Sequence, residues 1–511
     1  MIRFDNVSFS YNGETGSAGG VREITLDIPK GQFVVLCGES GCGKTTITRL
    51  INGLIPHYYE GRLAGSVYVD EKDVSRQPLF DTARTIGSVF QNPRSQFFNV
   101  DTTSEITFGC ENLGVSETEI LSRLERVTRE FHLRKLLDRS IFSLSGGEKQ
   151  KIACAGVSVM RPDIFVLDEP SSNLDAPSIQ ELRDILSFWK AQGKTIVVSE
   201  HRLYYLRGLA DRFLYLKDGS IQGDYTAEQF EQLGETKRAS MGLRAFVLSG
   251  LRAKPHFPPP RQTICLKNFR FSYKNGPEIL RIPDCEIPAG QVVAVIGNNG
   301  AGKSTFSRCF CGLERKCGEI IWNGKKLKPK DRLKICYMVM QDVNHQLFTE
   351  SVKDEITISM AEENAEQAEK IISGLDLSEV QERHPMSLSG GQKQRAAIGS
   401  AIASHRSVLF LDEPSSGLDL RHMKEAADLL RQLQREGETV YVITHDLELI
   451  LECCTSVIYF QDGTIADQYQ ADEAGLQKLR DYFACSPTKG DPIKDAPTKA
   501  IPTKDAPAGL G

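Results

Sequence analysis

The chain has 511 residues, which predicts roughly two to four domains rather than one. Its composition, with 40% hydrophobic and 25% charged residues, is that of a globular protein with sizeable cores. The formal net charge of −5 gives no electrostatic reason to expect a nucleic-acid partner. No apolar run approaches the ~20 residues that cross a bilayer, and the N-terminus has no signal-peptide pattern. We therefore expect a cytosolic protein without direct bilayer insertion, which reaches a membrane only through a partner.

The first chemical motif follows an apolar run at residues 32–37, which predicts a strand. GESGCGKT comes next, and GxxxxGK[ST] between a strand and a helix is a phosphate cradle built from backbone N–H groups and a helix N-terminus. We expect Lys44 to reach the β- and γ-phosphates and the Thr45 hydroxyl to bind Mg²⁺. The candidate cradle residues of the first half are Gly38, Gly41, Gly43, Lys44, Thr45 and Thr46.

A second apolar run, residues 163–167, ends in the carboxylate pair Asp168 and Glu169. A strand that ends there places both side chains at the carboxyl edge of a parallel sheet, beside the phosphates. Asp168 can hold Mg²⁺ through water, and Glu169 can polarise the attacking water. Further runs at residues 195–199 and 213–216 predict another strand and a closing hairpin.

Residues 235–262 end in KPHFPPPRQ and predict a stiff, proline-rich connector. Beyond it the same motifs return: GNNGAGKS at residues 297–304, LSGGQKQ at 388–394 and LFLDEPSSGLD ending at Asp419. From Ser145 and Ser389 onward the two copies keep a constant offset of 244 positions. The chain is therefore a tandem repeat of two homologous domains. The second set of candidates is Gly297, Gly300, Gly302, Lys303, Ser304, Thr305, Asp412 and Glu413.

The second half also repeats the apolar runs, at residues 291–296, 408–411, 439–444 and 457–460. Strands alternating with helices predict an α/β fold, with a mostly parallel sheet covered by helices in each domain. We place the domains at residues 1–234 and 263–485. Residues 486–511 repeat PTK and KDAP, and we expect this low-complexity tail to be disordered. The 13 cysteines form no CxxC pair and indicate reduced, mostly buried thiols rather than a metal site.

The combination of LSGGxKQ with the carboxylate pair identifies the chain as a member of the ATP-binding-cassette family, here with two fused P-loop domains. The resemblance implies ATP and Mg²⁺ as ligands, and adds an antiparallel β subdomain and a helical subdomain to each domain. It implies three further pairs of roles: glutamines that touch Mg²⁺ or water, histidines that grip the γ-phosphate, and tyrosines that stack on adenine. These residues are Gln91 and Gln341, His201 and His445, and Tyr11 and Tyr273.

In this family the LSGG motif binds the γ-phosphate of the nucleotide on the opposite domain. The resemblance therefore implies that Ser389 and Gly391 complete the site of Lys44, and that Ser145 and Gly147 complete the site of Lys303. The two domains would then pair within one chain, with pseudo-twofold symmetry. Because both halves keep every catalytic residue type, we expect both sites to hydrolyse ATP.

FQNPRSQFFNVDTTSEITFG, from Phe90, and SEHRL, from Ser199, resemble the ATPases of energy-coupling-factor (ECF) importers. The second half keeps a looser version from Met340, and both copies depart from the pattern, at Arg94 and at Asp342–Val343. This resemblance implies a transmembrane coupling subunit and a small substrate-binding membrane subunit, at the cytoplasmic face of the cell membrane. The cargo would be a vitamin, a metal or another small micronutrient.

Three alternatives stay open. A soluble tandem ATPase acting on ribosomes or nucleic acid usually carries a long charged insert between its domains, whereas this connector is short and proline-rich. The fused ATPase of a sugar or peptide importer tends to lose residues in one site. An adaptor without turnover is opposed by Glu169 and Glu413.

Overall fold

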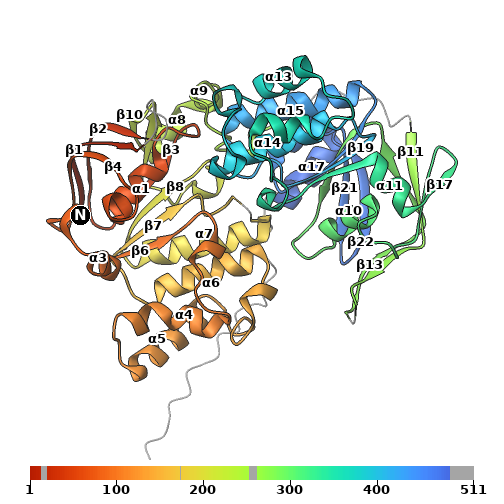
Figure 1. Ribbon diagram of the computed structural model, residues 1–511. Helices are drawn as coiled ribbons and strands as arrows, with labels where there is room; N and C mark the ends of the chain where they lie inside the picture. The colour runs from red at the N-terminus through yellow and green to blue at the C-terminus, as the bar shows by residue number, and fades with distance from the viewer. Residues whose placement is uncertain (13–19, 173, 253–261, 275, 484–511) are drawn as a thin grey trace, which may run out of the picture.

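The computed structural model describes residues 1–12, 20–172, 174–252, 262–274 and 276–483. Two α/β domains lie side by side, which confirms the predicted fold class. Figure 1 shows the antiparallel sheets at the two far ends of the molecule, and the helical subdomains projecting on opposite sides. This arrangement is the one expected when a pseudo-twofold axis relates the two domains.

Domain 1 is built on a six-stranded sheet with the order β10-β9-β3-β8-β7-β6, parallel except for the β9–β10 hairpin. Its central strands are buried along almost their whole length because helices cover both faces. The predicted strands agree to within one residue at each end. The strands are β3 (Phe33–Cys37), β6 (Ile86–Val89), β7 (Ile164–Asp168), β8 (Thr195–Ser199), β9 (Arg212–Lys217) and β10 (Ser220–Thr226).

Domain 2 repeats this sheet with the order β18-β19-β20-β15-β21-β22. In both domains the strand that carries the phosphate loop lies at the centre, next to the strand that precedes the histidine. The strands are β15 (Val292–Ile296), β18 (Cys336–Val339), β19 (Val408–Asp412), β20 (Thr439–Ile443), β21 (Ser456–Gln461) and β22 (Thr464–Gln470).

A smaller antiparallel sheet packs beside each central sheet, as the family resemblance implies. In domain 1 it contains β1 (Ile2–Tyr11), β2 (Val21–Ile28), β4 (Gly61–Val69) and β5 (Lys72–Asp73). In domain 2 it is split into a four-stranded and a two-stranded sheet. These strands are β11 (Gln262–Lys267), β12 (Phe269–Ser272), β13 (Glu278–Ile282), β14 (Cys285–Ala289), β16 (Glu319–Trp322) and β17 (Lys325–Leu327).

The helices of domain 1 begin with α1, directly after the phosphate loop, and α4 to α6 form the helical subdomain. They are α1 (Lys44–Ile51), α2 (Leu54–His57), α3 (Leu79–Thr85), α4 (Thr102–Asn112), α5 (Glu117–Glu130), α6 (Gly146–Ser158), α7 (Ala176–Ala191), α8 (Ala227–Gln232) and α9 (Gly234–Ser240). Those of domain 2 are α10 (Lys303–Cys311), α11 (Pro329–Ile335), α12 (Val352–Thr357), α13 (Ala365–Gly374), α14 (Gly390–Ala403), α15 (Leu420–Arg435), α16 (Leu447–Cys453) and α17 (Glu473–Phe483).

The connector differs from the prediction in its first part. Helix α9 lies inside it, and Met241, Leu243 and Phe246 are buried in the hydrophobic core of domain 1. Arg244, between them, forms buried ion pairs with Asp446 and Glu448 of domain 2. Residues 241–246 are thus a packed junction between the domains, while the proline-rich residues 253–261 and the tail lie outside the described part of the chain.

Within the described ranges, none of the helices is both long and apolar enough to cross a membrane. The twelve cysteines that the structure describes carry free thiols, and ten of them are buried.

Candidate active site

Both phosphate loops have the backbone shape of an anion cradle. They join β3 to α1 and β15 to α10, and Gly43 and Gly302 have φ angles of 101° and 98°. A Cβ atom on Gly43 would lie 2.8 Å from Val21 Cγ1 and 2.9 Å from the Gly20 carbonyl oxygen. Only glycine combines this conformation with this close approach. The N–H groups at the start of each helix can therefore face a phosphate.

The two lysines of the cradles are buried and lie folded over their own loops. Lys44 Nζ donates to the carbonyl oxygens of Gly38 and Glu39, both at 2.9 Å. Lys303 Nζ donates to the Asn298 carbonyl oxygen at 3.1 Å and lies 3.3 Å from His445 Nε2. Burial lowers the pKa of Lys303, although Glu413 and Asp412 oppose this effect. Each ammonium is held where it can exchange a carbonyl partner for a phosphate oxygen.

The aspartates at the strand ends lie beside the cradle hydroxyls. Thr45 Oγ1 donates to Asp168 Oδ1 at 3.2 Å, and Ser304 Oγ donates to Asp412 Oδ2 at 2.7 Å. Burial, followed by the charge of Glu169, raises the pKa of Asp168 to about 6. Burial also raises the pKa of Asp412. Hard oxygen donors gathered around an excess of negative charge fit a divalent cation such as Mg²⁺.

The two glutamates that follow these aspartates share a strained backbone but differ in surroundings. Glu169 and Glu413 have φ angles of 43° and 53°, a left-handed conformation that is rare outside glycine and clusters at functional sites. Gln91 Nε2 donates to Glu169 Oε2 at 2.7 Å, and His201 Nε2 lies 3.3 Å from Glu169 Oε1. The sequence-predicted glutamine, glutamate and histidine of the first half therefore meet at one point.

In the second half His445 Nε2 lies 3.6 Å from Glu413 Oε1. Gln341 lines the cavity that contains Lys303 and Glu413. Burial and the charge of Asp412 raise the pKa of Glu413 to about 7. Burial also works to raise the pKa of Glu169, but His201 and Lys44 outweigh it and lower that pKa. The two sites thus hold the same residue types, but the pKa of the glutamate is lowered in the first site and raised in the second.

The first cavity is shared by the two domains. It has a volume of about 960 Å³, and its lining includes Lys44, Gln91 and Glu169 from domain 1 together with Ser389 and Gly391 from domain 2. Ser389 caps α14 by accepting from the Gln392 N–H at 3.4 Å, so the helix N-terminus points into the cavity. The cavity therefore brings together the residues that the sequence predicts for the composite site of Lys44.

The second cavity, around Lys303, has a volume of about 250 Å³. Its described lining residues all come from domain 2, so the structure does not bring Ser145 and Gly147 into it. Ser145 does form a capping box with Glu148 at the start of α6, as Ser389 does with Gln392 in domain 2. The structure therefore does not bring the residues of the predicted second composite site together in one cavity, and that site stays a prediction.

The two tyrosines proposed for adenine also differ. Tyr11 lines the first cavity, and its hydroxyl contacts Thr46 Oγ1 at 3.2 Å and accepts from Arg49 Nη1 at 3.0 Å. Tyr273 is 40% exposed, packs edge-on against Phe271, and is not among the described residues that line the second cavity.

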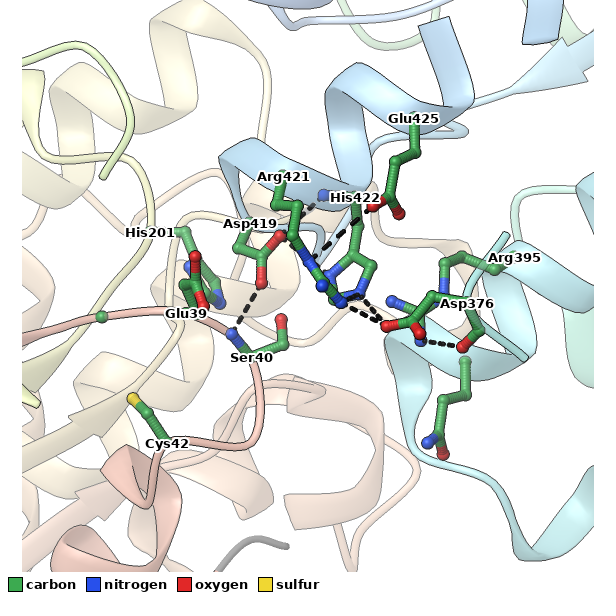
Figure 2. Close-up of polar contacts among 12 residues, drawn as sticks. Glu39, Ser40, Cys42, His201, Asp376, Arg395, Asp419, Arg421, His422 and Glu425 are labelled. Carbon is green, nitrogen blue, oxygen red and sulfur yellow. Dashed lines mark hydrogen bonds and ion pairs between the residues drawn. The ribbon is translucent and has the colours of Figure 1, made fainter. Parts of the chain in front are cut away.

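Two aspartates that the sequence reasoning did not single out join the domains at these sites. Asp419 Oδ2 accepts from the Ser40 N–H at 2.7 Å, as Figure 2 shows, and Asp175 Oδ2 accepts from the Asn299 N–H at 2.8 Å. Each aspartate thus holds the phosphate loop of the other domain. The sequence contains a signal for these aspartates, because Asp175 and Asp419 recur at the constant offset of 244 residues.

Comparison with known proteins places these features in a family. A family model described as "ABC transporter" matches residues 21–172 and 280–416. A Treponema denticola protein named "Putative ABC transporter ATP-binding protein" is 44% identical over 475 residues, covering 92% of this chain and 97% of its own. A Methanosarcina mazei protein of the same name is 32% identical over 521 residues, covering 91% and 88%.

Two solved structures share the overall fold. "RNase-L Inhibitor" has a TM-score of 0.63 and 19% identity, covering 93% of this chain and 92% of its own. "Model of ribosome-bound archaeal Pelota and ABCE1" contains a chain with a TM-score of 0.69 and 19% identity, covering 93% and 80%. At this identity the likeness shows the tandem α/β fold alone.

Proposed function

Because the chain belongs to the ABC transporter family and is a tandem ATP-binding ATPase, we propose that it is the motor subunit of a membrane importer. It would act with a transmembrane coupling subunit and a small substrate-binding membrane subunit, at the cytoplasmic face of the cell membrane. The Q-loop resemblance favours the ECF type, with a vitamin, a metal or another small micronutrient as cargo. The names of the relatives, which include "ABC transporter", agree with a transport role.

The observation that carries this proposal is an exposed phenylalanine that recurs at the same position after each of the two Q-loop glutamines. Phe98 and Phe348 follow Gln91 and Gln341 by seven residues each and are 76% and 74% exposed. Val100 and Ile358, farther along the same segments, are 67% and 61% exposed. Phe98 stacks on Phe108 and also borders the first cavity. Large exposed apolar side chains that recur in both halves are typical of a surface that a partner covers. We infer that each segment docks a helix of a membrane subunit.

In the proposed cycle ATP lies across the cradle, with Lys44 or Lys303 on its β- and γ-phosphates. Thr45 with Asp168, and Ser304 with Asp412, would hold Mg²⁺, which neutralises phosphate charge when it is bound. Glu169 accepts a proton from the attacking water, while Gln91 and His201 orient that carboxylate. The exposed segments after the glutamines would then transmit the conformational change that accompanies hydrolysis to the membrane subunits.

A soluble tandem ATPase that acts on ribosomes is the second candidate. The specific observation in its favour is that the two similar structures include a ribosome-bound one, although the likeness there is one of fold. The exposed phenylalanines favour a protein partner in either case, so an experiment must identify that partner.

Site-directed crosslinking makes this distinction. Ser95→Cys and Asn344→Cys place reactive thiols on exposed positions of the two segments, and Glu228→Cys on α8 is a matched control away from them. In native membrane vesicles we expect the first two variants, and not the control, to crosslink to an integral membrane protein. Crosslinks confined to ribosomal proteins would contradict the importer and support the soluble alternative.

A further inference from the structure

We propose that His422 is a positioning residue for the first nucleotide site. It fixes the aspartate that holds the phosphate loop of domain 1, and connects that aspartate to the helical subdomain of domain 2. The inference rests on the ATPase activity alone and not on the identity of the transport partner.

Asp419 is the residue through which His422 would act. Its side chain is 0% exposed, and its Oδ2 accepts from the Ser40 N–H at 2.7 Å, within the phosphate loop that carries Lys44. Ser40 lines the same cavity as Lys44 and Ser389. The orientation of the Asp419 carboxylate therefore sets how the loop of domain 1 meets domain 2 at this site.

His422 lies between two carboxylates, as Figure 2 shows. Its Nδ1 is 2.8 Å from Asp419 Oδ1, its Nε2 is 3.3 Å from Asp376 Oδ2, and its side chain is only 7% exposed. Its backbone N–H also donates to Asp419 Oδ1 at 2.9 Å, as expected for the N-cap of α15. The ring is in close contact with Asp419 at Nδ1, although this atom makes no aligned hydrogen bond, and its Nε2 also lies 3.1 Å from Arg421 Nη2. A buried ring in this position, together with the backbone N–H bond, leaves the Asp419 carboxylate little room to rotate away from Ser40.

The other charged groups around the ring connect it to the helical subdomain. Asp376 follows α13, pairs with Arg421 of α15, and accepts through its carbonyl oxygen from Arg395 Nη2 of α14 at 3.4 Å. Glu425 lies one turn farther along α15 and 3.8 Å from Arg421. Because α14 begins at Ser389, this cluster links the LSGG helix and the Asp419 contact at the same nucleotide site. A movement of the helical subdomain would therefore shift both the start of α14 and the Asp419 carboxylate, because Asp376 is connected to each of them.

The first half lacks this arrangement at the corresponding positions. The constant offset of 244 aligns His422 with Ser178 and Arg421 with Pro177. Continued back from Ser145 and Ser389, it aligns Asp376 with His132, and the φ angles of these two residues, 51° and 52°, agree. Asp175 still accepts from the Asn299 N–H, but its capping partner Ser178 has no ring to reach the helical subdomain. The proposal therefore predicts an effect at one nucleotide site only.

The test measures nucleotide release from each site separately. In a chain carrying Glu169→Gln and Glu413→Gln, Lys303→Ala restricts trapped ATP to the first site and Lys44→Ala restricts it to the second. His422→Ser, which copies the other half, should accelerate release from the first site about tenfold, the scale of one lost hydrogen bond to a charged group. Release from the second site should stay within about twofold, and Ser178→Ala should leave both sites within about twofold.

A double-mutant cycle separates positioning from loss of structure. Asp376→Asn, at a half-exposed position, should accelerate release from the first site by itself, and its effect should not add to that of His422→Ser. His422→Gln, which keeps one hydrogen-bond donor, should restore part of the retention. Equal acceleration at both sites, strict additivity, or an Asp376→Asn variant with normal release would overturn the proposal, whether or not His422→Ser folds.

Discussion

At the scale of single residues, the chemistry depends on two glutamates whose backbone is strained. Each follows an aspartate at the end of a strand of the main sheet. Its amide is fixed, because the Glu169 and Glu413 N–H groups donate to the carbonyl oxygens of Ser199 and Ile443 at 2.8 Å. The positive φ angles aim both side chains toward the histidines rather than along the strands. Such strain persists only where the surroundings enforce it, here by the sheet on one side and the following loop on the other.

Replacing both glutamates by glutamine tests their role as general bases. The amide keeps the shape and most hydrogen bonds but cannot accept the proton of the attacking water. We expect turnover of the Glu169→Gln, Glu413→Gln variant to fall by about 10²–10⁴-fold, with ATP binding preserved. Steady-state ATPase assays and equilibrium nucleotide binding provide the two measurements. Near-normal turnover would remove both residues from the mechanism.

At the scale of elements, the junction at residues 241–246 determines how the domains are joined. Arg244 is 2% exposed and pairs with Asp446, which is 3% exposed and caps α16 directly after His445. The charges of Asp446 and Glu448 outweigh burial and raise the pKa of Arg244, while Arg244 holds the pKa of Asp446 well below its usual value. The connector of domain 1 thereby holds the histidine loop of domain 2.

Replacing Arg244 tests whether this junction contributes more to the free energy of unfolding than an ordinary surface ion pair does. Arg244→Ala removes the cation that pairs directly with two buried carboxylates, so we expect a loss of about 3–5 kcal/mol of unfolding free energy. Arg207→Ala breaks an ion pair with Glu231, in which both side chains are about half exposed, and should cost at most about 1 kcal/mol. Denaturant titration compares the two variants. A similar small loss in both would show that the junction adds little stability.

The sequence predicted the elements far better than this junction. Apolar runs such as residues 32–37 and 439–444 matched β3 and β20 to within one residue, because a buried parallel strand must be apolar throughout. The phosphate loops were also predictable, since their motif encodes its own geometry. The presence of Ser389 and Gly391 in the Lys44 cavity was expected from the family resemblance. Arg244 gave no such signal, because Asp446 lies 202 positions away along the chain. For His422, Asp419 is only three residues away, but the contact with Asp376 spans 46 positions and gave no signal.

At the scale of the whole molecule, the two domains meet through contacts that are related by symmetry but differ in detail. Asp419 holds the Ser40 loop and Asp175 holds the Asn299 loop at nearly equal distances. In contrast, the Lys44 cavity includes Ser389 and Gly391, whereas the described lining of the Lys303 cavity comes from domain 2 alone. Reciprocal pairing therefore predicts that the second site completes itself when Ser145 approaches the bound nucleotide.

Two double variants decide whether each LSGG motif serves the opposite domain. Lys44→Ala with Ser389→Arg removes two parts of one composite site, so the Lys303 site should still trap about one nucleotide per chain. Lys44→Ala with Ser145→Arg removes one part of each site, so trapping should be lost at both. Trapped-nucleotide stoichiometry is the measurement, since turnover can fail cooperatively in either variant. If the second variant retains a nucleotide and the first retains none, each motif serves its own domain, and the shared cavity around Lys44 is not the site of hydrolysis.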